Sequence, residues 1–419
     1  MYALVDAVAF YASAEKVFDP AIRSKPVVVL TNNDGCICAV CPIARRLNIP
    51  KFAPYFKVKQ LLAQNNVVIR SSNYELYADL SDKMMNVIGR FCDVQHVYSI
   101  DESFLHFNGY TPIINDWFAY GHTIRRTVWR ETKLPVGVGF GSTATLAKAA
   151  NHAAKKLSGF NGVAVINCEA SRKAILQRMS CQDIWGIGKR LAKKLKVMNI
   201  HTAWQLAQQN PNSMRRAFSV VVERTVNELN GIPCLNWDDV RQDKREIFST
   251  RSFGERIYEP TALKTALINH VTVVASKLRK QKSLTKQLYI FAASSSHENV
   301  FYKKSYMYTF ASPTNDTCVM ASAVSQVFEQ IYQPGIRYYK CGVGALELIA
   351  QQFQQDDLFN ERTDNPPLMN CLDAINKRYG KGMLSLASSK LNEGWHMNRN
   401  FLSPQYTTRW RDIPKIYCE

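Results

Sequence analysis

The stretch Y-S-I-D-E-S, Tyr98 to Ser103, places two carboxylates side by side. It follows V-Q-H-V, a pattern typical of the end of a half-buried strand. Neighbouring side chains of a regular strand point to opposite faces, so Asp101 and Glu102 can serve one site only if the strand ends, bulges or turns there. Because adjacent acids also repel each other, the stretch is either a solvated turn or part of a site that holds a positive charge.

A third acid, Asp6, ends the first predicted strand, Y-A-L-V-D. If Asp6 converges with Asp101 and Glu102, the three carboxylates need cations, and hard oxygen ligands suit Mg²⁺ or Mn²⁺. Two such ions about 4 Å apart can activate an attacking oxygen and neutralise a leaving one in phosphoryl transfer. The alternative is that Asp101 and Glu102 form a solvated turn and that Asp6 caps a helix.

Strands and helices alternate around these acids, which indicates an α+β domain with a site where strands end. The patterns predict strands over 2–6, 26–30 and 136–140, and helices over 10–18, about 37–47, 73–88 and 145–157. The run P-V-V-V-L at 26–30 is continuously apolar, which predicts a strand covered on both faces.

Length and charge limit the class of protein. A chain of 419 residues predicts about three or four domains. Its net charge of +19 is explained most simply by a polyanionic partner such as nucleic acid, although a generally basic protein is the alternative. No apolar run is long enough to cross a bilayer, and the start M-Y-A-L-V-D lacks the basic lead of a signal peptide, so we expect no membrane association.

The cysteines predict free thiols in a reducing cytoplasm, because 11 is an odd number and they are scattered along the chain. Cys36, Cys38 and Cys41 form a cluster. A metal site needs a fourth ligand, which does not stand nearby in the sequence, so we interpret these three as small buried side chains.

A second and a third region each carry a basic helical pattern. In D-I-W-G-I-G-K-R-L-A-K-K-L (183–195) a Gly-x-Gly turn precedes a helix, and T-A-W-Q-L-A (202–207) predicts the next one. This order indicates a helix–hairpin–helix whose glycines let backbone N–H groups approach a DNA phosphate; an ordinary capped turn is the alternative. In the helix around 276–282, the basic side chains form either a phosphate-facing surface or a solvated face. These side chains are Lys277, Arg279, Lys280, Lys282 and Lys286.

A set of motifs resembles the Y-family translesion DNA polymerases, and most closely their UmuC-like members. The motifs are D-A-V-A-F-Y-A-S, S-S-N-Y-E-L-Y, Y-S-I-D-E-S, L-A-K-A-A-N-H-A-A-K-K, W-G-I-G-K-R, S-T-R-S-F-G-E-R-I (249–257) and L-S-P-Q-Y-T-T-R (402–409). They occur in the family's order over essentially the whole chain. The sequence departs from the usual pattern at Val8, Pro42 and Ala144.

The resemblance implies an α+β multidomain fold, a right-handed polymerase with palm, fingers, thumb and an α/β little finger. The expected boundaries are 1–20 and 75–166 for the palm, 21–74 for the fingers, 167–235 for the helix–hairpin–helix thumb, 244–348 for the little finger, and 349–419 for a clamp-motif segment and tail.

The resemblance also implies roles for individual residues. Asp6, Asp101, Glu102 and the carbonyl of Ala7 would hold two Mg²⁺ ions. Tyr11 would be the steric gate that excludes a ribonucleotide's 2′-hydroxyl; otherwise it is a packed core aromatic. Triphosphate contacts would come from Phe10, Tyr11, Arg45 and Lys155, the last two being surface cations in the alternative interpretation. DNA-backbone contacts would come from Gly186, Ile187, Gly188, Lys189, Lys277, Arg279 and Lys280.

The segment Q-D-D-L-F resembles a sliding-clamp motif, with Gln355, Leu358 and Phe359 as the binding residues. The implied function is error-prone synthesis past damaged bases in the SOS response of a bacterium, in the nucleoid-containing cytoplasm. Primer-template DNA, dNTPs, a sliding clamp, a UmuD-like dimer and a RecA filament are the expected partners. Two alternatives are a catalytically weak DNA-binding subunit that acts through partner proteins and a different two-metal phosphotransferase or nuclease.

Overall fold

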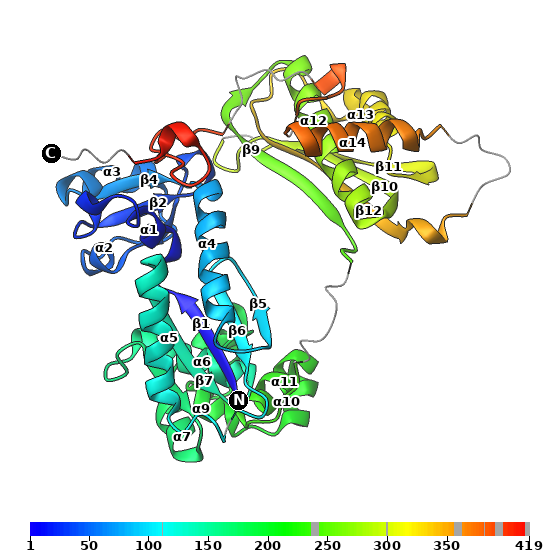
Figure 1. Cartoon of the computed structure of the whole chain (residues 1–419). Coiled ribbons are helices and arrows are strands. Elements are labelled where there is room, and N and C mark those ends of the chain that lie inside the picture. Colours follow the sequence, from blue (N-terminus) through cyan, green and yellow to red (C-terminus); the bar gives the residue numbers. More distant parts are fainter. Residues whose placement is uncertain are drawn as a thin grey trace. The chain divides into compact units, whose positions relative to one another are not determined.

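The computed structural model describes residues 1–110, 112–235, 243–298, 301–355, 363–380, 382–389 and 397–414. The chain forms two compact units, which Figure 1 shows coloured along the sequence. The first unit consists of Met1–Asp238 together with Arg399–Glu419, and the second is Asp239–Asn398. The second unit is therefore inserted into the first, because the chain leaves the first unit and later returns to it.

The first unit contains most of the alternating elements. Its strands are β1 (Tyr2–Ala7), β2 (Val27–Leu30), β3 (Ile37–Val40), β4 (Val68–Ser71), β5 (Gln95–Val97), β6 (Glu102–His106), β7 (Val136–Gly141) and β8 (Val163–Ile166). Its α-helices are α1 (Phe10–Glu15), α2 (Pro42–Arg46), α3 (Tyr55–Gln64), α4 (Tyr74–Gly89), α5 (Trp117–Thr132), α6 (Ala144–Lys156), α7 (Glu169–Gln177), α8 (Lys189–Val197), α9 (Ala203–Ala207), α10 (Pro211–Ala217) and α11 (Val220–Leu229).

A five-stranded sheet with the order β5-β6-β1-β7-β8 forms the centre of this unit (Figure 1). Strand β1 lies between β6 and β7 and is antiparallel to both. Its residues alternate between faces: Ala3 and Val5 belong to the core that includes side chains of α4 and α5, whereas Leu4 packs with Ala147 of α6. Asp6 shares the parity of Leu4, so it belongs to the α6 face.

Helix α6 approaches this sheet closely because β7 carries glycine at alternate positions. A Cβ atom on Gly139 would lie 2.0 Å from the backbone nitrogen of Asn151 in α6, so a larger residue would push the helix away. The Asn151 amide donates to the carbonyls of Leu4 at 3.1 Å and Gly137 at 2.8 Å. These contacts fix the height of α6 above the strands that carry the acids.

A smaller sheet, ordered β3-β2-β4, also belongs to the first unit. All four residues of β2 are buried, as the apolar run predicts. The helix expected over 37–47 is wrong: the first half is strand β3, which pairs with β2, and only Pro42–Arg46 is helical. Pro42 is suited to the first turn of a helix, and the buried Cys41 caps it by accepting from the Ala44 N–H.

The helical region from α7 to α11 contains the Gly-Ile-Gly turn. The turn lies between the short 3₁₀ helix Cys181–Asp183 and α8, as predicted for a Gly-x-Gly turn that precedes a basic helix. The stretch 198–202 then links α8 to α9.

The second unit packs helices on a four-stranded antiparallel sheet with the order β11-β10-β12-β9. Its elements are β9 (Ile247–Ile257), α12 (Pro260–Gln281), β10 (Ser283–Ala293), β11 (Lys303–Thr314), α13 (Thr317–Ile331), β12 (Tyr338–Ala350) and α14 (Pro366–Tyr379). The basic stretch at 276–282 includes the last turns of α12, whose opposite face supplies Val271 and Val274 to the core. Across the described ranges, no helix has the length and apolar character needed to span a membrane.

Candidate active site

Asp6 and Glu102 face each other across two neighbouring strands. They are direct partners in the antiparallel register of β1 and β6, so their side chains emerge on the same face of the sheet. The sequence interpretation placed Asp101 and Glu102 at the end of a strand, and this is wrong. β5 ends at Val97, and Glu102 is the first residue of β6. Because β6 runs antiparallel to β1, its beginning lies beside the end of β1, and the acids still meet.

The turn before β6 fixes Asp101. The Ser99 hydroxyl donates to Asp101 Oδ1 at 2.7 Å and accepts from the N–H groups of Asp101 and Glu102 at 3.3 and 3.2 Å. The Ala7 N–H donates to the Asp101 carbonyl at 2.9 Å. Asp101 thus lies opposite the last residue of β1 but before the first residue of β6. Because Asp101 is outside the strand, its side chain need not point to the face opposite that of Glu102.

Two lysines of α6 hold the paired carboxylates. Lys155 Nζ lies 2.6 Å from Asp6 Oδ2, and Lys148 Nζ lies 2.8 Å from Glu102 Oε2. The lysines are seven residues apart, about two helical turns, so they share one face of α6. The Lys148 ammonium also lies 4.7 Å from the centroid of the Tyr98 ring and 5.0 Å from that of Trp185, so both rings attract it.

The environment raises the pKa of Asp6 to about 6. Burial is the largest cause, because the carboxylate loses water. The ion pair with Lys155 lowers the pKa but does not offset burial, and the charges of Glu102 and Asp101 raise it further. Additional positive charge would stabilise the charged form of a carboxylate in this environment.

We call Asp6, Asp101 and Glu102 the acidic edge, because they lie where β1 ends and β6 begins. The ligands that it offers are carboxylate oxygens, which suit a hard divalent cation. Within the described part of the chain, no three Asp, Glu, His or Cys side chains are arranged as a ready-made metal cage. The ammonium groups of the two lysines instead lie beside Asp6 and Glu102. The residues therefore fit a metal site once the lysines yield the carboxylate oxygens.

Tyr11 lies half-buried on α1 and stacks on the ring of Tyr77, with centroids 4.5 Å apart and planes inclined by 16°. Burial raises the pKa of Tyr11, and the Asp101 charge adds to this rise, so the tyrosine lies within electrostatic reach of the acidic edge. Phe10 differs, because only 3% of it is exposed and its ring packs in the core. A triphosphate contact by Phe10 is therefore restricted to its main chain.

The basic residues expected at the nucleotide divide into two groups. Lys155 lies in the acidic site itself, bound to Asp6. Arg45 is exposed in the last turn of α2, and the described residues give it no carboxylate partner. Arg45 remains free to meet an anion, whereas Lys155 must leave Asp6 to do so.

The Gly-Ile-Gly turn leaves the start of α8 open. Gly186 has a φ of +86°, which favours glycine, and Gly188 caps α8 with no atom within 4 Å of the position of a Cβ. Ile187 is buried beneath the turn, and Lys189 is exposed beside it. Such a helix start presents free N–H groups to a phosphate.

On α12, the three cations expected on one DNA-facing surface behave differently. Lys277 and Lys280 are exposed. Only 8% of the Arg279 side chain is exposed, and its guanidinium bonds both carboxylate oxygens of Asp373 at 2.7 and 2.8 Å. Arg279 thus fastens α14 to α12 and is not presented to a phosphate, because an internal carboxylate already satisfies it. Gln355 is exposed, and Leu358 and Phe359 lie outside the described residues.

Some residues of the site were not predicted from the sequence, notably Lys148, Ser99 and Asn151. A signal for Lys148 existed, because it precedes Lys155 by seven positions in a helical pattern. Ser99 and Asn151 carry no such signal, since their roles depend on backbone groups of other segments.

Comparison with a solved structure identifies the class of the fold. A solved Y-family DNA polymerase chimera of Dbh and Dpo4 superposes with a TM-score of 0.64 at 18% identity, covering 83% of this chain and 99% of that one. The fold is thus that of the Y-family DNA polymerases, which confirms the predicted fold class.

The sequence comparisons identify the family. Residues 5–152 match the impB/mucB/samB family, 169–200 its HHH motif, 244–358 its C-terminal domain, and 366–416 a domain of unknown function, DUF4113. Protein UmuC of Salmonella typhimurium is 38% identical over 99% of this chain and 100% of its own length. Protein ImpB of the same species is 38% identical over 99% of both. The chain belongs to the impB/mucB/samB family, and the predicted resemblance is confirmed.

Proposed function

We propose that this protein is a DNA-directed DNA polymerase that copies past damaged template bases. The observation that carries the proposal is the pairing of Asp6 with Glu102 across β1 and β6, with Asp101 held at the same strand end. These residues belong to a Y-family fold, in a chain with a net charge of +19.

In the proposed reaction, the primer 3′-oxygen attacks the α-phosphorus of a dNTP. A new phosphodiester P–O bond forms, the bond between the α-phosphorus and the bridging oxygen breaks, and pyrophosphate leaves. Two bound Mg²⁺ ions would activate the 3′-hydroxyl and neutralise charge on the leaving group. Asp6, Asp101, Glu102 and the Ala7 carbonyl would hold these ions. Lys155, released from Asp6, would then pair with the triphosphate, together with Arg45.

Tyr11 would lie beneath the sugar of the incoming nucleotide. Its stacking on Tyr77 limits how far the ring can retreat, so a 2′-hydroxyl would clash with it. The 1–20 and 75–166 palm, the 21–74 fingers and the other predicted boundaries belong to the same proposal.

DNA would be held through its backbone. The open start of α8 with Gly186, Gly188 and Lys189 would bind one phosphate, and Lys277 and Lys280 would face others. We also propose, from family membership, a role in the SOS response at the bacterial nucleoid. The partners would be a sliding clamp bound through Gln355, Leu358 and Phe359, a UmuD-like dimer and a RecA filament.

A catalytically weak DNA-binding subunit is the second candidate. The observation that favours it is the occupation of both carboxylates by lysines, which has to be reversed before a cation can bind. DNA binding without nucleotide incorporation in every combination of partners would select this candidate.

Primer extension with Mg²⁺ tests the proposed function. Wild type should incorporate dNTPs, and Asp101→Ala and Glu102→Ala should not. Glu131→Ala is the matched control, because Glu131 pairs with Arg90 on the surface and should be dispensable. Equal incorporation by all four proteins would contradict the metal site, and degradation of DNA without dNTPs would indicate a nuclease instead.

A further inference from the structure

The C-terminal segment returns to the first unit and lies along the smaller sheet. We call residues 399–414 the clasp. The Ser71 N–H, at the end of β4, donates to the Phe401 carbonyl at 3.0 Å, and the Phe401 N–H donates to the Ser71 hydroxyl at 3.0 Å. The Asn400 N–H donates to the buried Asp34 carboxylate at 2.8 Å. The clasp thus bonds to the end of β4 and to Asp34 although it lies more than 300 residues downstream.

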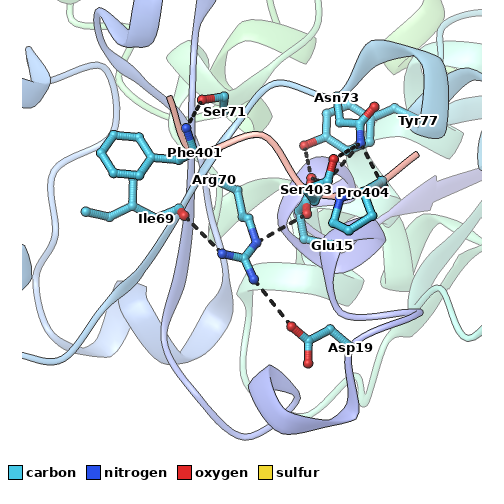
Figure 2. A network of polar contacts seen from close by, with 10 residues as sticks. All are labelled: Glu15, Asp19, Ile69, Arg70, Ser71, Asn73, Tyr77, Phe401, Ser403 and Pro404. Atoms are coloured by element: carbon cyan, nitrogen blue, oxygen red, sulfur yellow. Dashed lines mark hydrogen bonds and ion pairs between the residues drawn. The ribbon is translucent and has the colours of Figure 1, made fainter. Parts of the chain in front are cut away.

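A buried polar network holds the middle of the clasp (Figure 2). The Asn73 amide donates to the Ser403 carbonyl at 3.2 Å, the Ser403 hydroxyl at 2.9 Å and the Pro404 carbonyl at 3.3 Å. The Ser403 hydroxyl in turn donates to Glu15 Oε1 at 3.1 Å. Exposed fractions of 0% for Asn73, 6% for Ser403 and 2% for Glu15 show that water does not replace these contacts.

Aromatic and charged contacts flank this network. The ring of Tyr406 stacks on Phe18 with centroids 5.1 Å apart, and Phe401 meets Tyr55 edge-on at 5.7 Å. Arg399 Nη1 lies 3.3 Å from Glu75 Oε2. Buried amides and carboxylates without partners are costly, so the surface under the clasp is built to be covered by it.

The network leads from the clasp to Tyr11. Glu15 Oε1 also accepts from the Tyr77 hydroxyl at 2.6 Å, and Tyr77 is completely buried (Figure 2). The ring of Tyr77 is the surface on which Tyr11 stacks. Ser403 is therefore connected to the proposed sugar gate through Glu15 and Tyr77.

We propose that the clasp is a positioning element of the nucleotide site. It fixes Glu15, and through Glu15 the orientation of the Tyr77 ring that supports Tyr11. This inference rests on the proposed function of Tyr11 and deepens it. It also gives a role to the second part of the DUF4113 region, which matches 366–416 and therefore spans α14 in the second unit and the clasp in the first.

The sharpest test is Asn73→Asp in the full-length protein. An aspartate keeps the side-chain oxygen that caps α4 at the Leu76 N–H, but it loses the donors to Ser403 and Pro404. Asn210→Asp is the matched control, because Asn210 caps α10 through the same atom at the Ser213 N–H. Trypsin cleavage after Arg399 reports whether the clasp has been released.

Single-nucleotide incorporation is then measured with a dNTP and the matching rNTP. For Asn73→Asp we expect faster cleavage after Arg399, a KM for the dNTP raised about tenfold, and a preference for dNTP over rNTP lowered about tenfold, while Asn210→Asp matches wild type. An unchanged preference despite a released clasp would overturn the proposal, and so would unchanged protection from trypsin.

Two further variants keep the test decisive. If Asn73→Asp does not fold, Ser403→Ala should shift the preference in the same direction by about threefold. Its control is Ser389→Ala, which removes a buried serine hydroxyl of the second unit that donates to the Leu386 carbonyl. Tyr11→Ala distinguishes the proposal that Tyr11 is the sugar gate from the proposal that the clasp positions it. If it leaves sugar preference unchanged, the proposed gate fails; if it abolishes the preference and the clasp variants do not alter it, only the clasp proposal fails.

Discussion

Two carboxylates of the first unit, the half-buried Asp6 and the buried Glu15, have different kinds of partner. Asp6 meets the ammonium of Lys155, a single flexible side chain that can move away. Glu15 accepts from the hydroxyls of Tyr77 and Ser403 and lies 3.6 Å from Arg70 Nε, so several segments enclose it. Burial raises the pKa of both carboxylates. The difference teaches that a single exchangeable cation marks a site for chemistry, whereas several partners from different segments mark architecture.

Substitutions of Asp6 and Glu15 should differ most in their effect on catalysis. Asp6→Asn should lower the rate of nucleotide incorporation about a thousandfold, because an amide cannot hold a divalent cation in place of the carboxylate. Glu15→Gln should lower it by about tenfold at most, since it acts only through Tyr77 and Tyr11. Single-turnover primer extension measures both, and equal losses would remove the distinction.

The free energy of unfolding should depend on pH differently in wild type and in Asp6→Asn, because only wild type binds a proton at Asp6. The pKa of Asp6 is about 6 in the folded protein against 3.8 for an unperturbed group. Its contribution to stability is therefore full below pH 3.8 and is lost as the pH rises through 6. From this shift we expect wild type to lose up to about 3 kcal/mol more unfolding free energy than Asp6→Asn between these limits.

Denaturant titration at a series of pH values measures this difference. Parallel pH profiles for wild type and Asp6→Asn would contradict the raised pKa.

The proposed sugar gate links the two regions, because Tyr11 stacks on the ring of Tyr77, whose hydroxyl donates to Glu15, and lies within electrostatic reach of Asp101. Tyr11→Ala should lower the preference for dNTP over rNTP about a hundredfold, since the obstacle to the 2′-hydroxyl is removed. Tyr11→Phe is the control, because it keeps the ring and should keep the preference. Competition between a dNTP and its rNTP in primer extension gives the ratio directly.

The smallest effect is expected at Lys148. Lys148→Ala removes the ammonium from Glu102 but leaves the carboxylate able to bind a cation. We expect a few-fold lower Mg²⁺ requirement and a rate within about threefold of wild type. A higher Mg²⁺ requirement would show that Lys148 supports the cation site and does not compete with it.

The sequence predicted the acidic edge because its signals are local. Asp6 ends an apolar run, and Asp101 and Glu102 stand next to each other, so strand patterns and the family resemblance were sufficient to bring them together. The position of Glu102 at the start of β6 was missed, since the turn at 98–101 depends on hydrogen bonds of Ser99 that no periodicity reveals.

The clasp lay beyond prediction for a different reason. Ser403 and Glu15 are separated by 388 positions, and neither belongs to a pattern that points to the other. The partner of Arg279 was hidden in the same way, because Asp373 lies 94 residues later on another helix. Charge alone predicted a phosphate contact there, whereas the packing of α14 decides the outcome.

The central claim, that Asp6 holds a divalent cation, is tested most directly by Mn²⁺ binding. Electron paramagnetic resonance titration would compare wild type, Asp6→Asn and Glu15→Gln, each with primer-template DNA and a non-reactive dNTP analogue. The account predicts two bound Mn²⁺ ions in wild type and Glu15→Gln, and affinity at least about tenfold weaker in Asp6→Asn. Equal Mn²⁺ affinity and stoichiometry in all three proteins would contradict it.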